Sequence, residues 1–211
     1  MGRYKRCYMT DHTWNPDDYR FEFPDVPRYE GELVDMPIHH KVEKVRRFLI
    51  EGVLSEIERC INSGAELAGL LLSLATVDYL AGYYVGRQTT RHDYINFMLH
   101  YFPAKYHPYL EDVYIQLRSG LMHNLVAANP WRHESTSFLI HPREEHHLDF
   151  NKHGKLIFSV AHFRIDIYRA WRMHAHDIIM KAEANPQLVN NFNARFDRLK
   201  GVSAFMERVP D

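Results

Sequence analysis

The chain contains an uninterrupted apolar run, Leu67-Ala68-Gly69-Leu70-Leu71-Leu72-Ser73-Leu74-Ala75-Thr76-Val77, in which no residue is charged. Glu66, Asp78 and Arg87 bracket this run, and the pattern predicts a helix over about residues 65–86. A helix that is apolar nearly all round lies either at the centre of a helical bundle or in a membrane. The run has roughly half of the ~20 residues that a membrane span needs. We therefore expect a buried core helix and no membrane partner.

Length and composition are those of an ordinary globular domain. The chain has 211 residues, of which 45% are hydrophobic and 25% charged, enough for one domain with its own core. Its net charge is -1, so RNA binding would need a local basic patch or a groove between two subunits. Cys7 and Cys60 lack metal-ligand spacing, and the N-terminus has no apolar segment typical of a signal peptide. These features predict a cytoplasmic protein with free thiols.

Hydrophobic residues recur at three- and four-residue steps in several other segments. These segments predict helices over about residues 38–61, 93–101, 108–128, 161–184 and 187–205. Residues 137–141 and 155–160 predict strands. Residues 146–150 are a further candidate strand, with residues 151–154 as its turn, so we expect a small β-hairpin or meander at about 136–160. Residues 1–36 show no sustained period, so we expect either an extended arm or a partly disordered tail. The expected fold class is mainly α, with one helical domain over residues 37–205 that includes an additional terminal helix.

The segment Arg118-Ser119-Gly120-Leu121-Met122-His123-Asn124 lies inside one of these helices. Arginine offers a permanent charge and a bidentate fork for phosphate, and histidine can move a proton near neutral pH. Five residues place Arg118 and His123 about 140° apart on a straight α-helix, so the two side chains do not share a face. Gly120 could relax this geometry, or two copies of the chain could bring the groups together. The alternative is that Arg118 forms a core ion pair and His123 packs at a helix interface.

Asp78 is the natural partner of Arg118. It lies in the most apolar helix of the chain, where a carboxylate is costly unless it is paired or hydrogen-bonded. Arg118 lies in the other strongly apolar helix. A pair between them would stabilise the core and would also hold the guanidinium rigid, as supporting residues do in active sites.

Two motifs and their helical setting resemble the HEPN superfamily. The first is S-L-x-x-x-D-Y-L-A-G at residues 73–82, and the second is R-S-G-L-x-H at residues 118–123. The resemblance covers roughly residues 40–184 and implies a four-helix up-down bundle, a homodimer, and a metal-independent endoribonuclease site shared by two subunits. It also implies that Arg118 and His123 are catalytic. The residue after the arginine is often Asn, Asp or His in active members of the family, whereas this chain has Ser119.

The chemistry that the resemblance implies needs no cofactor. The ribose 2′-hydroxyl attacks the adjacent phosphodiester, His123 moves a proton, and Arg118 stabilises the charge on the phosphate. Ser119 and Asn124 would orient the phosphate, and Asp78 would support Arg118. The family also contains non-catalytic modules, so the alternative function is binding of RNA, a nucleotide or a protein partner, or a structural dimer without a ligand. By analogy alone, the protein would be a toxin or a stress or phage-defence effector with an antitoxin or regulatory partner.

Residues outside the motif offer weaker indications. Trp131 and Arg132 follow the motif helix and could stack on bases and contact phosphates, or Trp131 could cap the helix end in the core. Three arginines of the later helix could also contact phosphates or be ordinary surface residues, and three tyrosines at helical spacing are expected to pack. These are Arg164, Arg169 and Arg172, and Tyr79, Tyr83 and Tyr84. The chain has 15 histidines, but none is arranged with a metal-binding spacing, so no metal site is expected.

Overall fold

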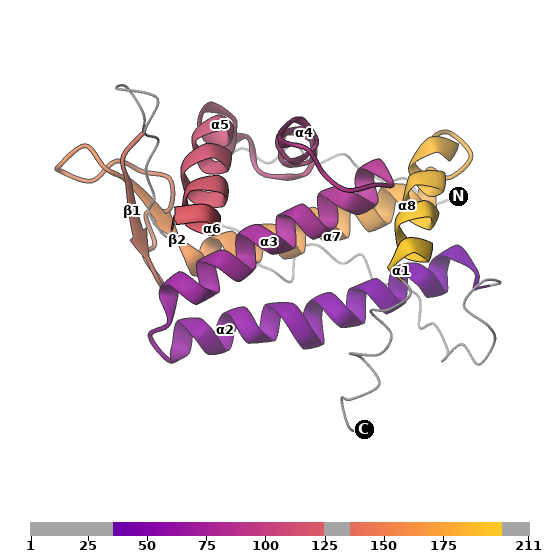
Figure 1. The fold of residues 1–211 in the computed structure, drawn as a ribbon, viewed down its shortest axis with the longest axis horizontal. Coiled ribbons are helices and arrows are strands. Elements are labelled where there is room, and N and C mark those ends of the chain that lie inside the picture. Colours follow the sequence, from indigo (N-terminus) through magenta and orange to yellow (C-terminus); the bar gives the residue numbers. More distant parts are fainter. Residues whose placement is uncertain (1–35, 125–135, 200–211) are drawn as a thin grey trace, which may run out of the picture.

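A computed structural model describes residues 36–124 and 136–199, and these residues are mainly helical (Figure 1). The elements are α1 (Ile38–Arg47), η3 (Phe48–Leu54), α2 (Ser55–Asn62), α3 (Glu66–Val85), α4 (Arg91–Tyr101), η4 (Ala104–Tyr109), α5 (Leu110–Asp112), η5 (Val113–Gly120), α6 (Leu121–Asn124), β1 (Phe138–His141), β2 (Leu156–Ser159), α7 (Val160–Met180) and α8 (Pro186–Arg198). Each predicted helix is confirmed to within a few residues, as far as the described residues extend.

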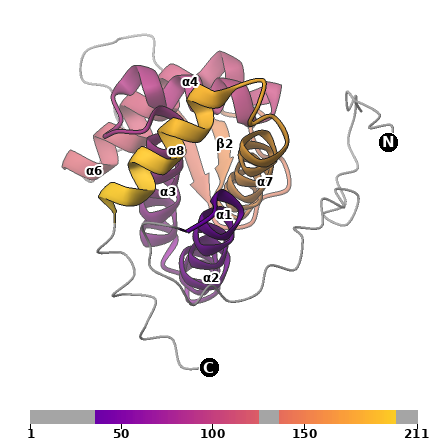
Figure 2. The same ribbon diagram turned by 90° about the vertical axis from the view of Figure 1, so that its right-hand side faces the viewer.

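The apolar helix α3 lies at the centre of the body. It contacts α2, α4, α7 and α8, and Figures 1 and 2 both show it between α2 and α4. Leu70, Leu74, Val77 and Leu80 on this helix are all 0% exposed. Within the described part of the chain, α3 is the one helix that is long and apolar enough to cross a membrane, and 56% of its most apolar window is buried. Its burial and its contacts with four other helices are those of a core helix.

Local sequence signals set the end of α3 and the start of α4. Gly86 follows α3 with φ 73°, a left-handed conformation that favours glycine. Asn191 of α8 donates its side-chain amide to the carbonyl of Tyr84 at 2.8 Å, which satisfies one of the free carbonyls at the helix end. Thr90 and Asp93 form a reciprocal capping box at the start of α4.

Two helices contain stretches of wider π-helical winding. The first runs continuously over residues 38–62 and includes η3, and the second runs over residues 110–124 and includes η5. Such stretches are rare and usually appear as single turns inside α-helices, often at functional sites. Arg118 and Ser119 both lie in η5.

The expected β-hairpin between the two predicted strands is wrong. β1 and β2 pair in parallel, with Phe138 opposite Leu156 and His141 opposite Ser159. Parallel strands need a crossover connection, and here residues 142–155 provide it. Its last part folds back on the other edge of β2, where the backbone N–H of Leu148 donates to the carbonyl of Ile157 at 2.8 Å. The turn predicted at residues 151–154 is confirmed, and it brings Phe150 of the crossover segment antiparallel to Leu156 of β2.

Several predictions fall on residues outside the described ranges. They are the arm over residues 1–36 apart from Met36, the cysteine Cys7, the proposed RNA contacts Trp131 and Arg132, and the end of the last helix over residues 200–205.

Candidate functional site

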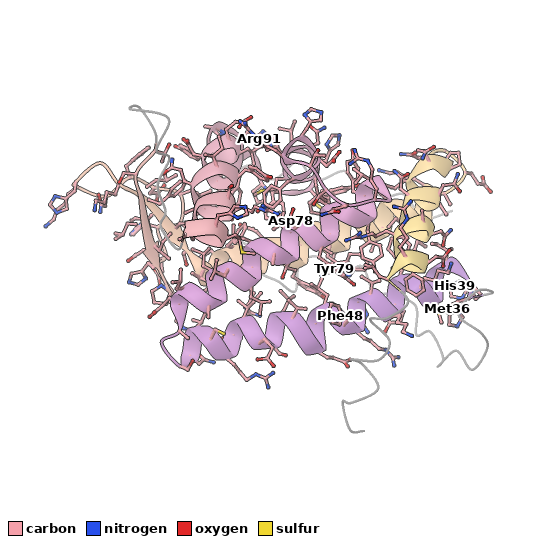
Figure 3. The ribbon with its side chains drawn as sticks, viewed as in Figure 1. Met36, His39, Phe48, Asp78, Tyr79 and Arg91 are labelled. Atoms are coloured by element: carbon pink, nitrogen blue, oxygen red, sulfur yellow. The ribbon has the colours of Figure 1, made fainter. Side chains whose placement is uncertain are left out.

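Arg118 forms the predicted ion pair with Asp78. Its Nε atom donates to Asp78 Oδ2 at 2.7 Å, and its Nη2 atom lies 2.6 Å from the same oxygen. The other carboxylate oxygen, Oδ1, accepts a hydrogen bond from Thr89 Oγ1 at 2.9 Å. Asp78 thus connects three parts of the fold, which are α3, η5 and the segment between α3 and α4. Figure 3 shows Asp78 on α3, with its neighbour Tyr79 directed toward Phe48. The guanidinium is held along one edge by a single oxygen.

The Arg118 side chain remains a partly exposed cation. It is 25% exposed and Asp78 is 20% exposed, and the guanidinium lies over the Tyr114 ring at 5.4 Å. Burial by itself would lower the pKa of Arg118, but the hydrogen bonds and negative charge of Asp78 outweigh burial and raise it. Nη1 makes no hydrogen bond to a residue within the described ranges. Arg118 is thus a paired cation that stays partly exposed to solvent.

Tyr94 of α4 lies beside this ion pair and was not singled out from the sequence. It is 0% exposed, its ring meets the Tyr114 ring edge-on at 5.2 Å, and its hydroxyl has no hydrogen-bond partner among the described residues. Burial, and then the negative charge of Asp78, raise the pKa of Tyr94 well above its ordinary value, so it stays a neutral phenol. No local pattern marks Tyr94 or Thr89, because both reach Asp78 only through the packing of α4 against α3.

His123 is exposed at the surface on α6, and Ser119 is half-buried. The expected alternative of a core-packed His123 is therefore wrong. Arg118 lies in the π-helical stretch η5, and His123 lies in the α-helix α6 that continues it. Asn124 ends α6, and only its place in the helix is described.

The remaining histidines do not form a metal site in the described part of the chain. No group of three His, Cys, Asp or Glu side chains there is arranged to hold a metal ion. In the pair His146–His147, the first is 72% exposed at its side chain and the second is buried. His174 is buried and His176 is partly exposed. The two histidines of each of these pairs thus lie in different environments, as their spacing predicts.

The later arginines and the tyrosines make contacts within the protein. Arg164 pairs with Glu58 at 3.0 Å, and Arg172 lies over the Tyr168 ring at 5.7 Å. Tyr79 and Tyr83 are hydrogen-bonded to each other at 3.2 Å. The packing expected for these two tyrosines is confirmed.

Comparison of the chain with protein-family models, with curated proteins and with solved structures finds no match in any of the three. The HEPN resemblance therefore rests on the two sequence motifs and their helical setting.

Proposed function

We propose that the protein is a metal-independent endoribonuclease whose site is completed by two copies of the chain. One observation carries the proposal: Asp78 holds the Nε–Nη2 edge of the Arg118 guanidinium, while the Arg118 side chain stays 25% exposed. A guanidinium fixed in this way can bind a phosphate without losing much side-chain freedom. His123, on the continuation of the same helix, is exposed and able to exchange protons with a substrate.

The proposed reaction is transesterification followed by release of the product. The ribose 2′-oxygen forms a bond to phosphorus, the bond between phosphorus and the 5′-oxygen breaks, and the products carry a 2′,3′-cyclic phosphate and a 5′-hydroxyl. One proton leaves the 2′-hydroxyl and one proton reaches the 5′-oxygen. Two copies of His123, one from each subunit, can serve as the base and the acid. The two Arg118 side chains stabilise the charge on the phosphate oxygens.

The composite site is the reason for proposing a homodimer with a HEPN-like four-helix up-down core. On a single helix, Arg118 and His123 are separated in angle, whereas a two-fold axis near η5 and α6 can place one copy of each around the same phosphate. Ser119 and Asn124 are proposed to orient the phosphate, with Trp131 and Arg132 contacting neighbouring nucleotides. A cytoplasmic toxin or defence effector controlled by an antitoxin or another regulatory protein is the role that analogy suggests.

The test is RNA cleavage in EDTA by the wild-type protein and two variants. His123→Ala removes the proposed acid and base, and His153→Ala removes an exposed histidine of the crossover turn as a matched control. We expect wild type and His153→Ala to leave cyclic-phosphate ends, and His123→Ala to lose cleavage while unfolding at the same urea concentration. Equal cleavage by His123→Ala, or no cleavage by wild type, would contradict the nuclease proposal.

The second candidate is a non-catalytic module that binds RNA, a nucleotide or a protein partner. The ion pair itself favours this candidate, because Asp78 already neutralises much of the charge of Arg118. Under this candidate, wild type and His123→Ala bind single-stranded RNA equally and neither cleaves it, whereas Arg118→Ala weakens binding. A protein that binds no RNA and sediments as a dimer would instead be a structural dimer or a partner-binding module.

A further inference from the structure

A chain of buried hydrogen bonds lies outside the proposed nuclease site. It joins His147 of the crossover segment to Tyr106 of η4 and Asp166 of α7. The Tyr106 hydroxyl is 2.7 Å from His147 Nε2 and 2.9 Å from Asp166 Oδ2. Tyr106 is 0% exposed, His147 is 5% exposed and Asp166 is 7% exposed. This chain connects segments that are 41 and 60 residues apart in the sequence.

The hydrogen-bond partners fix the proton positions along the chain. The backbone N–H of Ser159 donates to His147 Nδ1 at 2.9 Å, so Nδ1 must carry a lone pair and the proton of the neutral ring lies on Nε2. Nε2–H then donates to the Tyr106 oxygen, and the Tyr106 hydroxyl donates to Asp166. A second proton can enter the ring only at Nδ1, where it would face the N–H of Ser159 and break that bond.

The charged groups around His147 also oppose a second proton. Lys105 of η4 lies 3.9 Å from Asp166 Oδ2, and the His162 ring of α7 is stacked on the His147 ring with centroids 5.8 Å apart. Burial, then Lys105, then His162 lower the pKa of His147 to about 2. Burial also raises the pKa of Asp166, although the positive charge of Lys105 and the hydrogen bond from Tyr106 oppose this rise.

The segment next to His147 is held in a strained conformation. Leu148 has φ 68°, the one positive φ of a non-glycine residue within the described ranges, and this left-handed conformation is unfavourable for a residue with a Cβ atom. Its side chain is 7% exposed, and its N–H is bonded to the Ile157 carbonyl. Release of His147 would allow Leu148 to leave this conformation. The strain at Leu148 therefore opposes the hydrogen bonds that hold His147 in place.

We propose that the His147–Tyr106–Asp166 chain is an acid-sensitive latch that holds the crossover segment, residues 142–155, on the helical body. At neutral pH, the unprotonated His147 accepts from Ser159 and donates to Tyr106, and the segment is closed. Acidification protonates His147 in the open state alone, which shifts the equilibrium toward opening. The opening equilibrium constant rises by about tenfold for each pH unit below 6.5.

Hydrogen exchange tests the latch directly. Between pH 7.5 and 5.0, and after correction for intrinsic exchange rates, we expect opening at the amides of Leu148, Ile157 and Ser159 to increase by about 10- to 30-fold. The lower value of this range allows for Asp166, whose raised pKa favours the closed state as the pH falls. Amides in the centre of α3 should keep their protection over this pH range.

Two variants separate the latch from general acid sensitivity. His147→Asn does not titrate and keeps an acceptor near the Ser159 N–H, so the acid-induced increase in exchange of these amides should disappear, whatever their absolute rate. His153→Asn removes an exposed histidine of the same segment and should behave like wild type. A pH-dependent increase that persists in His147→Asn, or that is absent in wild type, would overturn the proposal.

The imidazole tautomer gives a second measurement that needs no variant. Nitrogen and carbon chemical shifts of His147 at pH 7.5 should show the proton on Nε2. A proton on Nδ1 would contradict the hydrogen-bond directions on which the latch depends.

Discussion

Acid sensitivity of the whole fold is predicted to depend on His174, a histidine in the core. His174 is 0% exposed, and its ring is surrounded by Tyr84, Phe97, Tyr101 and Trp171. Burial lowers its pKa to about 3, and the negative charge of Asp177 opposes this only in part. The folded protein therefore keeps His174 neutral at any pH above about 4.

The sign and magnitude follow from proton linkage. Below its ordinary pKa of 6.5, His174 takes up a proton in the unfolded state but not in the folded state, so the free energy of unfolding falls as the pH falls. Between pH 7.5 and 5.0 this loss is about 2 kcal/mol for one histidine. His147 contributes a similar amount, for a total of about 4 kcal/mol. A typical domain has about 5–15 kcal/mol of stability, so the loss is a large part of the whole.

The pH window separates the histidines from most carboxylates. Hydrogen bonds and charges from arginines help to lower the pKa values of Glu43, Glu58 and Asp93. The stability that these carboxylates contribute is present above about pH 4 and is lost only as the pH falls through their lowered values. Asp166, with its raised pKa, acts in the opposite direction to the histidines. A measurement that stops at pH 5.0 therefore reports mainly His174 and His147.

The assay is urea unfolding at pH 7.5 and pH 5.0 for wild type, His174→Gln and the exposed-site control His153→Gln. Glutamine does not titrate and retains polar atoms near the Tyr101 hydroxyl, which lies 3.2 Å from His174 Nδ1. His174→Gln should show a loss between the two pH values that is about 2 kcal/mol smaller than the wild-type loss, although its stability at pH 7.5 is lower. An unchanged difference between the two pH values in His174→Gln would refute the reasoning.

Four further substitutions test the fold and the ion pair by urea unfolding at pH 7.5. Asp78→Ala removes the carboxylate that accepts hydrogen bonds from Arg118 and Thr89 and should cost about 1.5–3 kcal/mol. An unchanged stability would show that this pair contributes nothing to the fold. Gly86→Ala places a Cβ atom 2.8 Å from the Cα of Asn191 and should cost more than the ~1–2 kcal/mol of a left-handed residue alone. Gly154→Ala, at φ 69° with open space around it, should show that lesser cost. Trp171→Ala empties a fully buried site and should cost about 3–5 kcal/mol, and a loss below 1 kcal/mol would contradict the packing of α7.

The Arg118–Asp78 pair shows how far sequence reasoning reached into the candidate site. A carboxylate in the most apolar helix needs a partner, and only a few cations lie in comparably apolar segments, so composition pointed to Arg118. Thr89 and Tyr94 were missed because their proximity to Asp78 follows from the angle at which α4 packs on α3. The exposure of His123 also depends on packing, since its sequence neighbours are equally compatible with a buried position.

The sequence by itself determined the positions of the helices, the central place of α3, and helix ends such as Gly86 and the Thr90–Asp93 capping box. These features depend on periodicity and on contacts between residues a few positions apart. The tertiary structure alone decided the parallel pairing of β1 with β2, the π-helical winding around Arg118, and the burial of His147 against Tyr106 and Asp166. Each of these depends on packing between segments distant in the chain, where many residues of the same type could have met and no local pattern selects the pair that does.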